Sequence, residues 1–259
     1  AGNPVCLEES GELAEISASL NKAGDYLLKK DNTRAEWIRG ISHDIRTPLS
    51  IVLGYASEIE DTVSLPEATR KQAGIIRRYS EKLKNLVADL NLTTKLEYSI
   101  QPLQKQKIDP VELARQVVSE VLNDGISELY ELELSEDNPG KNLSLVGDQA
   151  LLSRMLNNLI RNCIVHNPDG CTIQVSVGSC DAMCTFSVTD NGYGISEPQL
   201  NALNSGKDIS STQKQTGETE HGLGLKIVMQ IVKAHQGIIQ FADTIPHGLS
   251  IHISLPMKL

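Results

Sequence analysis

The sequence predicts an α+β protein of several domains: an all-α helical hairpin, followed by an α/β sandwich with a mostly antiparallel sheet and helices on one face. Two observations predict this division. Through the first hundred residues, apolar positions recur every three or four residues, as in amphipathic helices. From residue 104 on, short helical segments are interspersed with segments that alternate apolar and polar residues. Such alternation is typical of strands with one face in water.

The helical part contains two amphipathic runs. Apolar heptad positions in the first run are Leu13, Ile16, Leu20, Ala23, Leu27, Ile38, Ile41, Ile45, Leu49 and Val52, with a stutter between Leu27 and Ile38. After a break at 61–66, those in the second run are Ile76, Leu83, Leu86, Leu90 and Leu96. One hairpin cannot bury both stripes well. The sequence therefore predicts a homodimer that forms a four-helix bundle through this hairpin.

The second part begins with a helix start signal, Asp109 as N-cap and Pro110 as first helical residue. Helices are predicted over 110–122, 148–166 and 223–236. Alternating apolar residues predict strands around 130–134, 173–177, 186–188 and 249–255. The polar segment 205–220 is predicted to be a long flexible loop.

Composition excludes several classes of partner and site. The net charge of −9 disfavours nucleic acid or an anionic membrane surface as the main partner, because both require basic patches. No apolar run reaches the roughly 18 residues of a membrane span. The five cysteines are irregularly spaced and include no pair of C-x-x-C motifs, so we expect reduced thiols rather than a structural zinc site.

A first candidate for chemistry is His43, in the middle of the first helical run. His43 lies on the opposite side of the helix from the seam residue Ile41, so we expect it to face solvent. A neutral, exposed imidazole can act as a nucleophile. Thr47 lies one turn further on the same face, whereas spacing alone does not turn Asp44 toward His43. Taken alone, this pattern also fits a surface histidine on a charged helix.

Two further clusters suggest a nucleotide site. Asn158 and Asn162 share a helix face, and amide oxygens can ligate a Mg²⁺ ion that also holds phosphates. Asp190, after a strand, can accept a hydrogen bond from an amino group, and the glycines of 190–194 allow a ligand close to the backbone. Residues 221–224 open a helix with glycines, which suits phosphate, but match neither a Walker A nor a Rossmann motif. Each cluster alone also fits an ordinary helix or loop.

Together, and in this order, the clusters resemble the sensor histidine kinases of two-component systems along nearly the whole chain. Residues 43–49, His-Asp-Ile-Arg-Thr-Pro-Leu, resemble the H box, and residues 158–166 resemble the N box. Residues 190–194 and 222–225 are similar to the glycine boxes of the Bergerat ATP-binding fold. Residues 8–13 resemble the start of the second helix of a HAMP linker.

The resemblance implies three parts: the end of a HAMP-like linker and signalling coiled coil (1–34), a dimerisation and phosphotransfer domain (35–103) and a catalytic ATP-binding domain (104–259). It implies that His43 takes the γ-phosphoryl group of ATP, while Asp44 orients the imidazole and accepts its proton. The phosphoryl group would pass to an aspartate on the receiver domain of a response regulator. Thr47 would position water for a phosphatase reaction on that regulator.

The resemblance also implies how ATP and Mg²⁺ bind. The expected binding residues are Asn158, Asn162, Asp190, Gly192, Gly194, Gly222, Leu223 and Gly224. Asn162 would ligate Mg²⁺, with Asn158 supporting the metal or the phosphates. Asp190 would bind the adenine amino group, and the two glycines after it would leave room for the ring. The glycines of 222–224 would give the phosphate lid its flexibility and N–H donors.

Three departures from the family pattern leave an alternative open. Val165 stands where Lys or Arg is common, Glu220 stands where glycine is usual, and no Phe occurs between Ile195 and Gly222. The alternative is a phosphatase-dominant or non-catalytic signalling scaffold of the same fold. Other Bergerat-fold ATPases, such as mismatch-repair proteins or chaperones, are disfavoured by the H box on a dimerising hairpin. The family also implies the cytoplasmic portion of a bacterial plasma-membrane protein, with no membrane contact by this portion itself.

Overall fold

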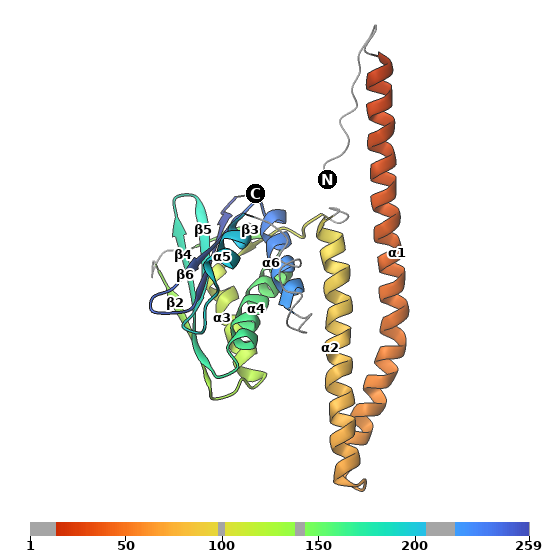
Figure 1. Ribbon diagram of the computed structural model, residues 1–259, viewed down its shortest axis with the longest axis vertical. Coiled ribbons are helices and arrows are strands. Elements are labelled where there is room, and N and C mark those ends of the chain that lie inside the picture. The colour runs from red at the N-terminus through yellow and green to blue at the C-terminus, as the bar shows by residue number, and fades with distance from the viewer. Residues whose placement is uncertain (1–13, 98–101, 138–142, 206–220, 259) are drawn as a thin grey trace. The chain divides into compact units, whose positions relative to one another are not determined.

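The computed structural model describes residues 14–97, 102–137, 143–205 and 221–258. Its contacts divide the chain into a helical unit, residues 1–101, and an α/β unit, residues 102–259 (Figure 1). A helical hairpin followed by an α/β unit with a mostly antiparallel sheet is the fold that the sequence predicts. None of the described helices is long and apolar enough to cross a membrane.

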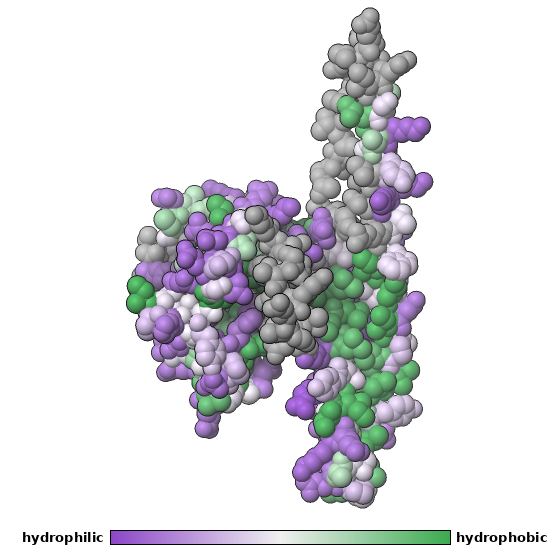
Figure 2. Space-filling view, in the orientation of Figure 1, coloured by the Kyte–Doolittle hydropathy of each residue, from purple (hydrophilic) through white to green (hydrophobic). Residues whose placement is uncertain are grey.

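The helical unit is a hairpin of two long helices, α1 (Ala14–Asp61) and α2 (Glu67–Glu97). α1 continues through Pro48. Figure 2 shows apolar side chains gathered along both helices, where a single chain leaves them uncovered. Those that are more than a third exposed include Ile51, Tyr55, Ile59, Ile76, Tyr79 and Leu83. One hairpin therefore leaves apolar surface exposed to water. This agrees with the prediction that a single hairpin cannot bury both apolar stripes.

Glu60 connects the two helices near the turn. Its Oε2 atom accepts a hydrogen bond from Arg77 Nε at 2.6 Å, and its backbone oxygen accepts one from Arg70 Nε at 2.9 Å. The Arg77 hydrogen bond lowers the pKa of Glu60. A Cβ on Gly74 would lie 2.7 Å from Glu60 Oε1, so the absence of a side chain there lets the carboxylate approach α2.

The α/β unit is built on a five-stranded sheet. The strand order is β2 (Tyr130–Glu136), β4 (Cys171–Cys180), β5 (Met183–Asp190), β7 (Leu249–Pro256) and β6 (Ile238–Asp243). Only the β2–β4 pair is parallel among these described pairs, and the other three are antiparallel. β1 (Gln106–Ile108) and β3 (Leu145–Gly147) form a separate antiparallel pair.

Three helices, α3 (Pro110–Asn123), α4 (Gln149–His166) and α6 (His221–Ala234), cover one face of the sheet (Figure 1). A short helix, α5 (Glu197–Asn204), contacts β6. The core between the helices and the sheet is aliphatic. Its fully buried side chains include Leu152, Leu156, Ile160, Ile173, Ile231 and Ile253, together with Phe186. Alternate residues of β5 are buried, as predicted for a sheet with one wet face.

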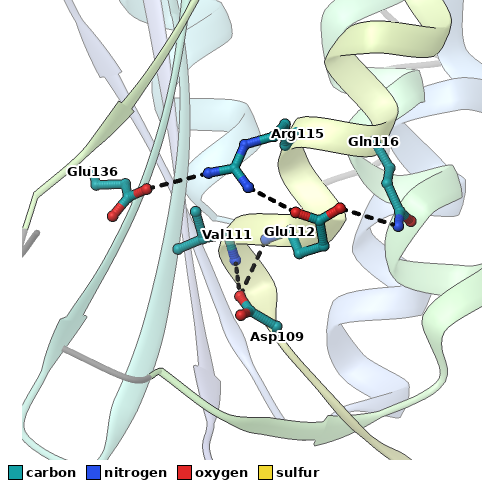
Figure 3. A network of polar contacts seen from close by, with 6 residues as sticks. All are labelled: Asp109, Val111, Glu112, Arg115, Gln116 and Glu136. Carbon is teal, nitrogen blue, oxygen red and sulfur yellow. Dashed lines mark hydrogen bonds and ion pairs between the residues drawn. The ribbon is translucent and has the colours of Figure 1, made fainter. Parts of the chain in front are cut away.

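The start of α3 is fixed by the predicted N-cap (Figure 3). Asp109 Oδ1 accepts hydrogen bonds from Val111 N at 2.9 Å and Glu112 N at 3.1 Å. Arg115 then pairs with Glu112 at 2.7 Å and with Glu136 of β2 at 3.6 Å. This network ties the first turns of α3 to the edge strand of the sheet.

Most predicted elements are confirmed to within a few residues. The helices predicted over 110–122, 148–166 and 223–236 are α3, α4 and α6. The sequence does not predict β1, β3, β6 and α5, which are short or lack clear alternation. The HAMP-like segment 8–13 and the loop predicted from residue 205, apart from Ser205 itself, lie outside the described residues.

Candidate active site

His43 lies on an exposed face of α1. Its side chain is 77 % exposed and that of Asp44 is 83 % exposed. His43 Nδ1 lies 3.4 Å from Asp44 Oδ1, a contact that the sequence spacing left open. The contact suits the tautomer with its proton on Nδ1, because that N–H can donate to the carboxylate. In that tautomer Nε2 carries the unshared electron pair and is the candidate nucleophile.

Residues near His43 on the other side of α1 are buried. Ser42 is 2 % exposed and donates a hydrogen bond through Oγ to Ile38 O at 2.7 Å. Leu49 is also buried. Thr47 lies one turn beyond His43, and its exposed hydroxyl donates to His43 O at 3.5 Å. Burial of one helix face therefore keeps His43 and Thr47 on the opposite, accessible face.

Asp190 is the last residue of β5, and its side chain is only 6 % exposed. Its Oδ1 atom accepts a hydrogen bond from Gly192 N at 3.0 Å. Burial, and then the negative charge of Asp190, raises the pKa of the Cys163 and Cys171 thiols. Both thiols therefore stay protonated at neutral pH and add no negative charge beside the carboxylate.

The glycines after Asp190 are required by the chain's own packing. A Cβ on Gly192 would lie 1.8 Å from Asn167 Oδ1. Gly194 has a φ of +68°, and its Cβ would lie 3.0 Å from Gly248 O. Gly248 has a φ of +129°, and its Cβ would lie 1.9 Å from Asp190 O. These contacts give the glycines a packing role within the chain itself, and the room for adenine that the family resemblance implies stays a prediction.

Gly248→Ala is expected to destabilise the α/β unit by ~3 kcal/mol or more, because the new methyl group would overlap the Asp190 backbone. Gly125→Ala is the matched control: Gly125 has a φ of +81°, but nothing lies within 4 Å of its Cβ position. That variant pays only the left-handed backbone penalty of ~1–2 kcal/mol. Chemical denaturation of both variants would measure the difference. Equal destabilisation would contradict the proposed overlap.

Asn162 of α4 faces the start of α6. Asn162 Oδ1 lies 3.4 Å from the position of a Cβ on Gly224. Gly222 and Leu223 belong to the same first turn of α6. Asn158 lies one turn before Asn162, and its Nδ2 atom is buried without a hydrogen-bond partner among the described residues. A buried donor without a partner reduces the free energy of unfolding, unless a ligand oxygen accepts a hydrogen bond from it.

These residues fit a nucleotide with Mg²⁺. Asn158 offers an unpaired donor, Asn162 offers a hard oxygen ligand of the kind that Mg²⁺ prefers, and Asp190 offers a buried acceptor. The structure brings Asn162 and Gly224 together, and Asn167 at the end of α4 contacts the loop after Asp190. His43, Asp44 and Thr47 belong to the helical unit.

Asn167 and His235 are two buried polar residues to which sequence reasoning assigned no role. His235 is fully buried, and its Nε2 atom accepts a hydrogen bond from Asp148 N at 3.0 Å. Its Nδ1 atom lies 2.8 Å from Ile231 O and donates to it. A Cβ on Gly147 would lie 3.1 Å from the imidazole. The neutral ring therefore joins the end of α6 to the start of α4. The two residues that it joins, Asp148 and His235, are distant in sequence, so no local pattern predicts this contact.

His235 predicts a pH dependence of stability. Burial lowers the pKa of His235 from its usual 6.5, although the hydrogen bond to Ile231 O and the charge of Asp148 oppose this shift. Below about pH 6.5 the unfolded chain therefore binds a proton that the native state refuses, so stability falls as pH falls. We expect the melting temperature to drop between about pH 7.5 and pH 5.5, and to drop less in His235→Gln. Identical slopes in both proteins would contradict this account.

Known proteins match each unit separately. Residues 33–99 match the His Kinase A (phospho-acceptor) domain, and residues 147–259 match the histidine kinase-, DNA gyrase B- and HSP90-like ATPase family. The sensor histidine kinase YvrG of Bacillus subtilis is 30 % identical over 255 residues, which is 92 % of this chain and 43 % of that protein. This chain belongs to the two-component sensor histidine kinases. The family resemblance that the sequence motifs predicted is therefore confirmed.

Solved histidine kinases share the fold of this kinase. Full-length ShkA, solved with AMPPNP, has a TM-score of 0.68 and 24 % identity over 85 % of this chain and 45 % of its own. ThkA, solved in complex with the response regulator TrrA, has a TM-score of 0.56 and 22 % identity over 88 % of this chain and 64 % of its own. The kinase chain spans about half the length of the curated relatives that it matches.

Proposed function

We propose that this histidine kinase transfers the γ-phosphoryl group of ATP to His43 and then to an aspartate of a response regulator. The observation that carries the proposal is the exposed His43–Asp44 pair within the segment that matches the phospho-acceptor domain. The match to the ATPase family supports ATP as the donor of the phosphoryl group. We assign phosphotransfer and dimerisation to residues 35–103, and nucleotide binding to residues 104–259.

The transfer requires little covalent machinery from the protein. His43 Nε2 forms a bond to the γ-phosphorus while the bond from that phosphorus to its bridging oxygen breaks, and ADP leaves with the electron pair. The proton on Nδ1 passes to Asp44, whose Oδ1 lies 3.4 Å away. Positioning and charge neutralisation supply most of the rate enhancement in such reactions.

The proposed nucleotide site consists of residues of α4, of the loop after β5 and of the first turn of α6. Asp190 accepts a hydrogen bond from the adenine amino group, which favours ATP over GTP. Asn158 Nδ2 would donate to a phosphate oxygen, consistent with the absence of a partner for it among the described residues. Asn162 holds Mg²⁺, which when bound neutralises charge on the phosphates. The backbone N–H groups of residues 222–224 face the phosphates from the first turn of α6.

The proposed assembly is a homodimer that binds a response regulator. Apolar side chains such as Tyr55, Ile76 and Leu83 are exposed on a single hairpin, and a second hairpin would cover them in a four-helix bundle. The fold relative ThkA was solved with a response regulator, which supports this class of partner. Thr47, one turn beyond His43 on the accessible face, is proposed to position water for dephosphorylation of the regulator.

Incubation with Mg²⁺ and γ-labelled ATP tests the proposal. The wild-type kinase should acquire label that is stable in alkali and lost in acid, as phosphohistidine is, and a receiver domain should remove that label. Asn162→Ala should acquire none. Acid-stable label would contradict the histidine assignment. ATP binding without any label would favour the alternative, a phosphatase-dominant or non-catalytic scaffold.

A further inference from the structure

Asn167 is a buried amide that joins the end of α4 to the loop after β5. It caps α4 and is 3 % exposed. Its Nδ2 atom donates a hydrogen bond to Cys163 O, one turn back in α4, at 2.8 Å. Its Oδ1 atom accepts a hydrogen bond from Tyr193 N at 2.9 Å. The donor fixes the orientation of the amide, so the acceptor is held toward the loop.

The loop lies directly against this amide. An added Cβ on Gly192 would approach Asn167 Oδ1, Cγ and Nδ2 to 1.8, 2.2 and 2.5 Å, so the backbone rests on the flat side of the amide. Gly192 N in turn donates to Asp190 Oδ1 at 3.0 Å. A short chain of contacts therefore runs from Asn167 through the Gly192 backbone to the buried Asp190 carboxylate.

The residues that follow Asn167 form hydrogen bonds to the same loop at two further points. Thr172 N donates to Asn191 Oδ1 at 2.8 Å, and Asn191 N donates to Thr172 O at 3.3 Å. The Tyr193 hydroxyl donates to Asp169. These contacts lie at the exposed edge of the loop, whereas the Asn167 amide is buried.

We infer that Asn167 is a positioning residue for nucleotide binding: it holds the 190–194 loop so that Asp190 stays aimed at the base. The inference rests on the proposed role of Asp190 toward adenine. Without the Asn167 amide, Tyr193 N–H loses its acceptor and Gly192 loses the surface on which it packs. The Gly192 N–H would then no longer restrain the Asp190 carboxylate, and ATP binding would have to order the loop first.

Asn167→Ala tests the inference in the full chain. We expect its Kd for ATP, measured by displacement of a fluorescent ATP analogue, to rise about tenfold, because binding must restore the lost order. The rate of phosphorylation at saturating ATP should stay within about twofold, because the Asn167 amide bonds to Cys163 and Tyr193, which are not among the proposed phosphate-binding residues. Asn157→Ala is the matched control, since Asn157 lies on the same helix and its Oδ1 atom accepts a hydrogen bond from Arg161, away from the 190–194 loop in sequence.

The separation of affinity from rate distinguishes positioning from a purely structural role. A structural defect would reduce the fraction of chains that bind, and would leave the Kd of the remaining chains unchanged. Unchanged Kd, with or without fewer binding sites, would therefore overturn the inference. Asn167→Ser keeps a hydroxyl that can donate and accept, so its Kd should lie between those of Asn167→Ala and the wild type.

Failure of the proposed function would look different. If the wild-type chain binds no ATP, or if the Asp190→Asn variant binds ATP as well as the wild type does, the assignment of Asp190 is wrong. The inference about Asn167, which rests on that assignment, is then wrong too. If wild-type binding depends on Asp190 but Asn167→Ala binds with wild-type Kd, only the inference fails.

Discussion

His43→Gln is expected to abolish phosphorylation of this kinase while its Kd for ATP stays within about twofold of wild type. The glutamine amide is a similar size but has no nucleophilic ring nitrogen. His43 is exposed and belongs to the helical unit, so its replacement leaves the nucleotide-binding α/β unit intact. The measurement is incorporation of label from γ-labelled ATP, alongside equilibrium binding of the nucleotide.

The control for this variant is His247→Gln, the same substitution at an exposed histidine of the α/β unit. It should incorporate label at the wild-type rate. If His43→Gln still incorporates acid-labile label, another residue is the phosphoacceptor. The exposed His43–Asp44 pair would then have no role in the transfer.

Asp190→Asn is expected to weaken ATP binding about a hundredfold. Gly192 N–H requires an acceptor at the position of Oδ1, 3.0 Å away, so the asparagine would keep its oxygen there. Its NH₂ group would then face the adenine amino group, and two donors cannot pair. Guanine presents a carbonyl oxygen at the corresponding position, so the preference for ATP over GTP should also fall.

Competition binding with ATP and GTP measures both effects. Asp181→Asn is the matched control, because Asp181 is exposed in the turn before β5, at the other end of the strand from Asp190. It should bind both nucleotides as wild type does. An Asp190→Asn variant with wild-type affinity for ATP would show that the base is recognised elsewhere.

Periodicity and start signals predicted the long elements well. The helices α3, α4 and α6 were predicted because apolar residues recur at helical spacing over several turns, and the Asp109 cap marks where α3 begins. β6 was missed because its sequence, Ile-Ile-Gln-Phe-Ala-Asp, does not alternate apolar and polar residues, and β1 and β3 span only three residues each. Elements that short are stabilised by their partners across the sheet, which a local pattern does not contain.

The site shows the same limit. Motif order identified residues such as Asp190 and Asn162, because a glycine-rich turn after a strand and paired amides on one helix face are local features. The contact between Asn167 and Tyr193 joins residues 26 positions apart, and His235 pairs with Asp148 across 87 positions. Pairings of this kind depend on the packed structure. The contact of Gly192 with Asn167 likewise gives this glycine a packing role that the local sequence does not contain.

The position of the phosphoryl group on the His43 ring tests the central claim most directly. The Nδ1 atom faces Asp44 Oδ1 at 3.4 Å, so Nε2 is the nitrogen with the available electron pair. Phosphorus NMR of the phosphorylated chain, denatured in alkali, together with mass spectrometry of its peptides, locates the group. We predict one phosphoryl group per chain, on Nε2 of His43. A phosphoryl group on Nδ1, or on any other residue, would contradict this account.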